Sequence, residues 1–87
     1  MKIKDGFILR EIAGSFIVVA VGEAVKTFNG VITLNETGAF LWKILEKGAE
    51  EQDLLSALLA EYDVEEEVAK EHVEKFIARL TEAKLIK

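Results

Sequence analysis

The side chains able to do covalent or acid–base chemistry are few and lie apart in this sequence. His72 is the only histidine and cysteine is absent, so no second residue completes a metal site or a nucleophile–base pair. Ser15 and Ser56 lack the sequence context of a catalytic serine. The six glycines are too scattered to form a phosphate-binding loop. We therefore expect no enzymatic activity, no cofactor and no bound metal ion.

Two basic residues, Lys75 and Arg79, stand one helical turn apart near the end of the chain. On a helix this spacing puts both charges on one face, where they could meet the acidic groups of a peptide. They could equally pair with Glu71 and Glu82 on the same helix and form a solvated surface. The sequence leaves these two interpretations open.

Length and composition restrict the classes of protein to which the chain can belong. Its 87 residues are expected to form one domain, residues 1–87, and 51% of them are hydrophobic, which suffices for one core. The formal net charge of −5 argues against a nucleic-acid partner, because such binding neutralises phosphates with Lys and Arg. The longest apolar run, residues 16–21, is far shorter than the roughly 20 residues that span a bilayer, and the N-terminus lacks a signal-peptide pattern. We expect a cytoplasmic protein without a membrane partner.

The first part of the chain has the apolar runs typical of strands. Phe7–Ile12 and Phe16–Val21 are separated by Ala13-Gly14-Ser15, and together they predict a β-hairpin. The run Phe16–Val21 is apolar on both faces. This pattern favours a central strand covered by helices, or alternatively a strand that offers an apolar face to a partner.

A third strand is predicted over Gly30–Leu34, after a connection that ends in the turn signal Asn29-Gly30. No later segment of the chain has the pattern of a strand that could pair with the other side of this third strand. We therefore expect an edge strand with one row of unpaired backbone N–H and C=O groups.

Asn35 marks the change from strand to helix, because its side chain can cap the first turn of a helix. Three helices are predicted, over about Glu36–Lys47, Glu50–Glu61 and Glu65–Ala83. Apolar residues recur at helical spacing in each of them. Residues 85–86 follow as an apolar tail that is expected to pack back on the core.

Segregated strands and helices predict an α+β fold. Three short helices with tight joints are typical of a helix-turn-helix. The expected fold is therefore a winged helix-turn-helix, a three-stranded antiparallel sheet followed by three helices. A DNA-binding regulator is one hypothesis for such a fold, but residues 65–84 contain six acidic and four basic residues, a net charge of −2. A recognition helix usually carries exposed Arg or Lys instead.

Peptide binding fits these elements better than DNA binding does. An edge strand can accept an extended peptide as an additional strand, here through the unpaired backbone groups of Val31, Ile32 and Thr33. If the third helix packs beside that strand, the two form a groove. Five residues of this helix would line the groove: Val68, His72, Lys75, Phe76 and Arg79. A homodimer or structural subunit that associates through the second strand or the sheet edge is the remaining alternative.

Three segments resemble the PqqD-like family: Leu34–Trp42 (LNETGAFLW), the joint Glu61–Val64 (EYDV), and the helix that precedes Leu85-Ile86. The resemblance extends from Phe7 to Ile86. It implies a non-catalytic winged helix-turn-helix protein that binds the leader segment of a ribosomally synthesised, post-translationally modified precursor peptide.

In the family that the chain resembles, the leader adds to the third strand and lies against the third helix. The resemblance further implies that the protein presents the precursor to a modifying enzyme, often of the radical-SAM type, or to a leader protease. His72 stands where many relatives have an acidic residue, so the charge preference of the leader is expected to differ here.

Overall fold

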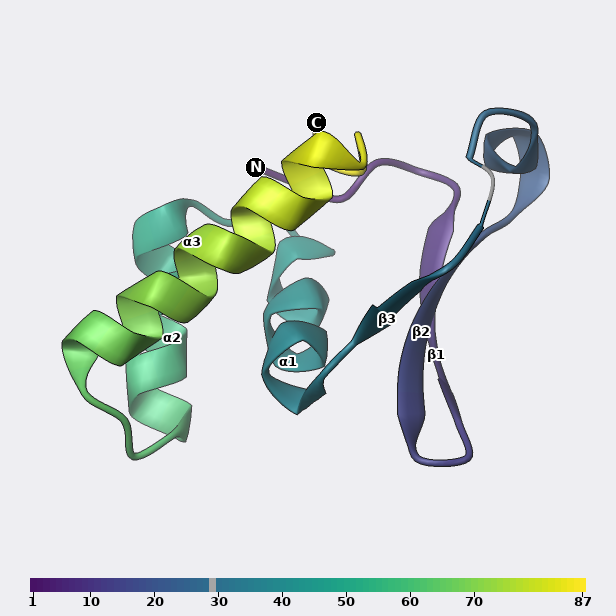
Figure 1. The fold of residues 1–87 in the computed structure, drawn as a ribbon. Helices are drawn as coiled ribbons and strands as arrows, with labels where there is room; N and C mark the ends of the chain where they lie inside the picture. The colour runs from purple at the N-terminus through teal and green to yellow at the C-terminus, as the bar shows by residue number, and fades with distance from the viewer. Residues whose placement is uncertain (29) are drawn as a thin grey trace.

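The computed structural model describes residues 1–28 and 30–87, and its elements follow the predicted order (Figure 1). Within these residues, three strands form an antiparallel sheet in chain order: β1 (Phe7–Ile12), β2 (Ser15–Ala20) and β3 (Ile32–Leu34). Three α-helices of the described chain follow: α1 (Glu36–Leu45), α2 (Glu51–Glu61) and α3 (Glu66–Glu82). This arrangement confirms the predicted α+β, winged helix-turn-helix class.

The predicted β-hairpin forms around a two-residue turn. Ala13 and Gly14 both have positive φ angles, 51° and 82°, which match the right-handed twist of the two strands that they join. Gly22–Lys26 forms a short 3₁₀ helix, called η1, where only a connection was expected. Of the predicted Asn29-Gly30 turn, Asn29 lies outside the described residues.

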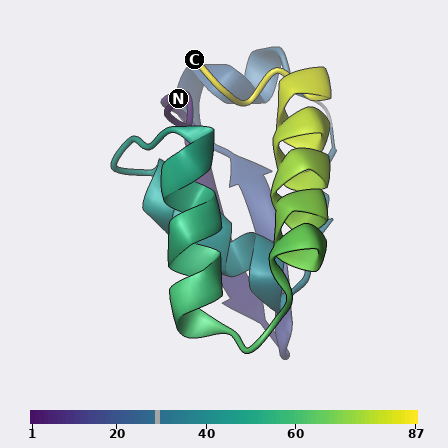
Figure 2. The same cartoon turned by 90° about the vertical axis from the view of Figure 1, so that its left-hand side faces the viewer.

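The α-helices lie on one side of the sheet, and α2 and α3 lie side by side (Figures 1 and 2). Between the helices and the sheet lies the core, whose largest fully buried side chains are Trp42, Leu41, Leu45, Leu54, Leu58, Leu80, Leu85, Val18 and Val73. β2 is the central strand, as predicted, but the helices cover only one of its faces. Val18 on that face is fully buried, whereas Ile17 and Val19 on the opposite face are half-buried.

Several element ends differ from the sequence prediction. β3 begins at Ile32 and not at Gly30, because Gly30 has a φ of 126°, outside the extended range of a strand. α1 ends at Leu45, two residues before the expected end, and Gly48 follows in a left-handed conformation (φ 96°). α3 begins at Glu66 and ends at Glu82, one residue inside each predicted bound.

The two chain ends meet on the core. Leu85 is fully buried, which confirms the predicted packing of the apolar tail, and Ile86 forms a β-bridge with Ile3. Ile3 is also buried, although its lysine neighbours in the sequence gave it no apolar pattern. None of the helices in the described ranges is long and apolar enough to cross a membrane.

Candidate functional site

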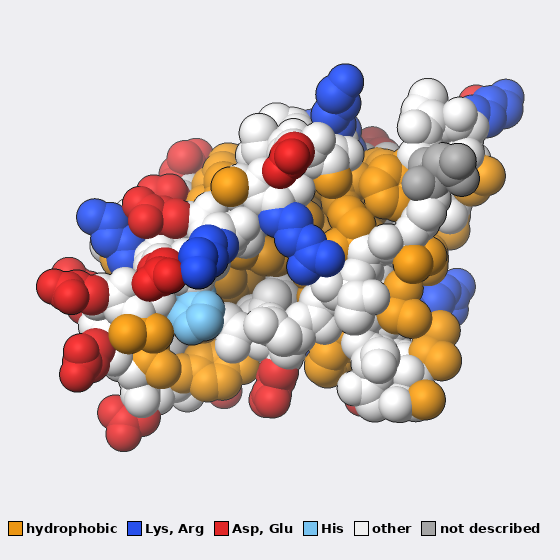
Figure 3. All heavy atoms as spheres, viewed as in Figure 1, with side chains coloured by type: hydrophobic (Ala, Val, Ile, Leu, Met, Phe, Trp, Pro, Cys, Tyr) orange, Lys and Arg blue, Asp and Glu red, His pale blue; other side chains and the backbone are white. Residues whose placement is uncertain are grey.

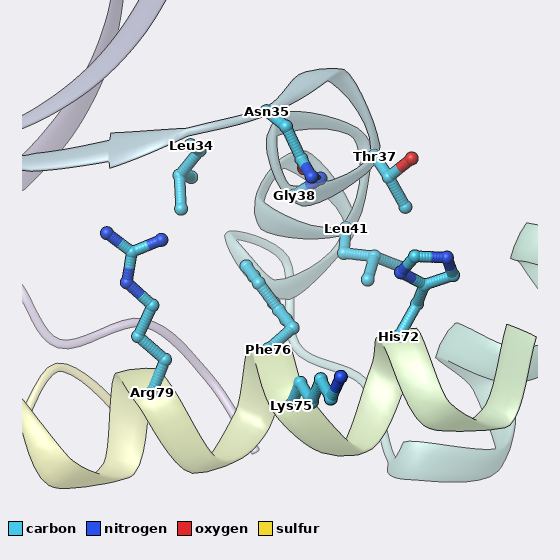
Figure 4. A pocket seen from close by; sticks show the side chains of 9 residues that line it. All are labelled: Leu34, Asn35, Thr37, Gly38, Leu41, His72, Lys75, Phe76 and Arg79. Atoms are coloured by element: carbon cyan, nitrogen blue, oxygen red, sulfur yellow. Dashed lines mark hydrogen bonds between the residues drawn. The ribbon is translucent and has the colours of Figure 1, made fainter. Parts of the chain in front are cut away.

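One hydrogen bond fixes the passage from β3 into α1. The Asn35 side-chain oxygen accepts from the backbone N–H of Gly38 at 2.7 Å, so Asn35 caps α1 as its sequence context predicts. The cap places the first turn of α1 directly after Leu34 at the end of β3. As a result, the strand end and the helix start together face α3 (Figure 4).

A groove with a cavity of about 180 Å³ lies between these elements and α3. It is lined by Leu34, Asn35, Thr37, Gly38, Leu41, His72, Lys75, Phe76 and Arg79. Three buried side chains, Leu34, Leu41 and Phe76, supply its apolar part. His72, Lys75 and Arg79 bring polar and cationic groups from α3. In Figure 4, Arg79, Phe76 and His72 point from α3 toward the end of β3 and the first turn of α1.

The two cations of α3 have different surroundings. Lys75 Nζ forms an ion pair with Glu71 Oε1 at 2.8 Å, one turn earlier on the helix. The hydrogen bond from Lys75 holds the pKa of Glu71 below its usual value, and the same bond raises the pKa of Lys75. Arg79 forms no ion pair and no side-chain hydrogen bond with any residue that the structure describes.

The helical pairing considered for these charges therefore holds for Lys75 and Glu71, but not for Arg79 and Glu82. Seen on the surface, acidic side chains gather at the beginning of α3, whereas the histidine and basic side chains border the hollow between α3 and β3 (Figure 3). The groove is more positive than the protein as a whole, whose net charge is −5.

The sheet register identifies which backbone groups of β3 are free. Opposite residues in an antiparallel pair alternate between hydrogen-bonded and non-hydrogen-bonded positions. The Val21 N–H donates to the Gly6 C=O at 2.7 Å, next to the Phe7–Ala20 pair. Residues 15, 17, 19 and 21 therefore direct their backbone groups toward β1, and residues 16, 18 and 20 direct theirs toward β3.

Val18 lies opposite Ile32, and Phe16 lies opposite Leu34, so these two β3 residues bond to β2. Thr33 lies between them, and its N–H and C=O consequently point away from β2 to the open edge. Val31 lies just before β3 and is not part of the ladder with β2. β3 is an outer strand of the sheet, which confirms the predicted edge. Ile32, however, uses its backbone groups within the sheet and has none to offer a peptide.

The other predicted site residues divide into those that reach the groove and those that do not. His72, Lys75, Phe76 and Arg79 line it. Val68 lies on α3 one turn before His72 and is exposed, but it does not line the groove. The side chain of Ile32 is buried in the core, whereas Val31 and Thr33 are exposed at the edge.

Five groove residues were not predicted as binding residues: Leu34, Asn35, Thr37, Gly38 and Leu41. The segment that contains them stood out in the sequence as a strand end, a cap and a helix start, and as part of the family resemblance, but none of its residues was assigned to the groove. Among the described residues, no group of three or more His, Cys, Asp and Glu side chains is placed to hold a metal ion.

Two solved structures of peptide complexes have the same fold as this chain. One is described as TbiB1 in complex with the TbiA(beta) leader peptide; it has 22% sequence identity and a TM-score of 0.78, and the match covers 100% of this chain and 95% of that chain. The other, lasso peptide synthetase B1 complexed with the leader peptide, has 19% identity and a TM-score of 0.73, with coverage of 97% and 93%. At these identities the likeness establishes the fold alone.

A search of curated proteins finds no match to this sequence. The match to a protein family is extensive, and it includes β2, β3 and all three α-helices of the described chain. Residues 15–86 match the family described as coenzyme PQQ synthesis protein D (PqqD), and the chain therefore belongs to the PqqD family.

Proposed function

We propose that this protein binds the leader segment of a ribosomally synthesised precursor peptide by adding it as a strand to β3. The observation that carries the proposal is the free edge of β3, which lies beside a groove lined by α3. An edge strand supplies backbone hydrogen bonds to any extended peptide, and a neighbouring groove selects among side chains. The bound leader peptides of TbiB1 and lasso peptide synthetase B1, which share this fold, support the proposal.

In this proposal the protein has no catalysis of its own and presents the precursor to a modifying enzyme or a leader protease. The groove contains a single histidine and no cysteine, so its side chains suit binding better than nucleophilic chemistry. DNA is a poor alternative ligand, because the cap residue Glu65 and the first two residues of α3, Glu66 and Glu67, would repel phosphate.

The direct test is a titration of isotopically labelled protein with synthetic leader peptides from short reading frames encoded near its gene. Binding by strand addition should shift the amide resonances of Val31, Thr33 and the groove residues of α3 in a saturable way. Shifts confined to the outer face of β1 and β2, or no shifts with any of these peptides, would count against the proposal.

A proline substitution sharpens the test, because the register assigns different roles to neighbouring backbone groups. Thr33→Pro removes an N–H that points to the open edge, where a sheet tolerates proline. We expect the fold to persist and the peptide affinity to fall by about tenfold, the value of one lost hydrogen bond. Thr33→Ala keeps the N–H and should bind normally.

Ile32→Pro is the contrasting variant, because it removes an N–H that bonds to β2 and should therefore destabilise the fold. Circular dichroism and amide spectra separate the two effects. A folded Thr33→Pro variant with wild-type affinity would show that the peptide does not pair with this edge.

A further inference from the structure

The charge and position of Arg79 bear on which peptide the groove accepts. The argument rests on the proposed function, since it begins with a peptide strand paired to β3. Directly opposite residues in neighbouring strands direct their side chains to the same face of the sheet, and successive residues alternate between faces. Peptide residues opposite Ile32 and Leu34 would therefore face the interior, and the residue opposite Thr33 would face away from it.

A peptide side chain placed opposite Leu34 would have apolar neighbours in the interior. Leu34 is 4% exposed, and in the groove it is accompanied by Leu41 and Phe76, which are 0% and 7% exposed. A charged side chain placed here would lose water without gaining a partner. The peptide residue beside Leu34 is accordingly expected to be apolar.

The other inward-facing peptide residue, the one opposite Ile32, lies closer to Arg79. α3 runs opposite to β3, so Arg79 lies on the side of Phe76 that is nearer to the start of the strand (Figures 1 and 4). Along the helix, the three residues from Phe76 to Arg79 correspond to a rise of about 4.5 Å. Interior side chains of an extended peptide are about 6.6 Å apart. The long arginine side chain can bridge this difference.

Arg79 also has the free charge that such a contact needs. It has no ionic partner among the described residues, whereas Lys75 is held by Glu71 at 2.8 Å. A guanidinium binds a carboxylate through two parallel hydrogen bonds. We propose that the groove selects peptides with an apolar and an acidic side chain two residues apart, the apolar one against Phe76 and the acidic one on Arg79.

The test selects binders from a displayed library of random peptides of about twelve residues, which extend to about 40 Å. The full-length wild-type protein is compared with Arg79→Glu and with Arg10→Glu. Arg10 is the matched control, because it is the other arginine of the chain, is exposed, and lies on β1 outside the groove.

With the wild type and Arg10→Glu, selected peptides should be enriched in Asp or Glu two residues from Leu, Ile, Val or Phe. With Arg79→Glu, this enrichment should disappear in favour of Lys or Arg. The affinity of a selected acidic peptide for Arg79→Glu should fall by about tenfold or more, as expected for a lost charge-assisted pair. Loss of helix stability alone would not reverse the charge preference, so the reversal identifies a direct contact.

The outcomes separate this inference from the function on which it rests. If peptides are selected and shift the amides of β3 but show no acidic enrichment, the role of Arg79 is wrong and strand addition stands. Enrichment that survives in Arg79→Glu would also refute the role of Arg79. If the wild type selects no peptide, the proposed function fails and the inference fails with it.

Discussion

The Asn35 side-chain oxygen lies 2.7 Å from the backbone nitrogen of Gly38, and this contact joins the sheet to the helices at the groove. Both residues line the groove, together with Leu34 immediately before them. The cap therefore has two consequences. It satisfies a backbone N–H that the first turn of α1 would otherwise leave unpaired, and it sets the position of that turn relative to α3.

Replacing Asn35 by alanine should destabilise the protein by about 1 kcal/mol, the usual value of an N-cap side chain. For a domain of this size, that loss lowers the melting temperature by about 4–8 °C. Thermal unfolding followed by circular dichroism measures the effect. Asn35→Ser keeps an oxygen at the cap and should remain close to the wild type; equal loss in both variants would show that the hydrogen bond contributes little.

Trp42 is fully buried in α1, and its indole Nε1 donates to Glu46 Oε2 at 3.2 Å. Trp42→Ala should cost about 3–5 kcal/mol, because it removes a large side chain from the core. A domain of this length has a stability of only about 5 kcal/mol, so the variant should keep no more than about 2 kcal/mol and should unfold at a much lower urea concentration than the wild type. Trp42→Phe fills much of the space and should stay folded. A folded alanine variant with a near-normal urea midpoint would contradict this account of the core.

The order of elements and the cap could be predicted from the sequence because both depend on local patterns. Periodicity distinguishes strand from helix within a few residues. Asn35 is a favourable capping residue directly between the two patterns. The exact start of β3 was missed, because the short apolar run does not reveal that Gly30 adopts a positive φ.

The candidate site could be predicted only in part, because a groove is formed by residues that are distant in the sequence. Four of the five residues predicted on the third helix line the groove, since helical spacing places them on one face. Spacing alone could not show that Lys75 pairs with Glu71 while Arg79 lacks a partner among the described residues. The spacing also could not show that the backbone of Ile32 is used within the sheet. That depends on which residues of β2 and β3 form the hydrogen-bonded pairs.

Alanine substitutions at Val18 and Val19 test which face of β2 packs against the core. The uniformly apolar sequence of this strand does not answer that question. Val18 is 0% exposed, whereas Val19 is half-buried on the opposite face. Val18→Ala should cost about 2 kcal/mol, from lost burial and from the cavity that remains. Val19→Ala should cost less than half as much. Urea unfolding of the two variants compares them directly, and similar losses would indicate that both faces are covered, for instance in a dimer.

Glu71→Gln should raise the affinity of the groove for an acidic peptide. At neutral pH the carboxylate is ionised, as expected for a glutamate whose pKa Lys75 lowers further, and the ion pair keeps the lysine from other partners. Removing the carboxylate charge releases Lys75 beside Arg79 at the groove. Since exposed ion pairs are weak, the expected gain is only about two- to fivefold.

Glu74→Gln is the matched control for this prediction. It makes the same change in net charge on the same helix, but Glu74 is not an ion-pair partner among the described residues and does not line the groove. Fluorescence anisotropy with a peptide that binds the wild type measures both variants. If Glu71→Gln and Glu74→Gln increase the affinity equally, the gain comes from the overall charge of the protein. A gain confined to Glu71→Gln would identify the Lys75 ammonium as a second, masked cation of the groove.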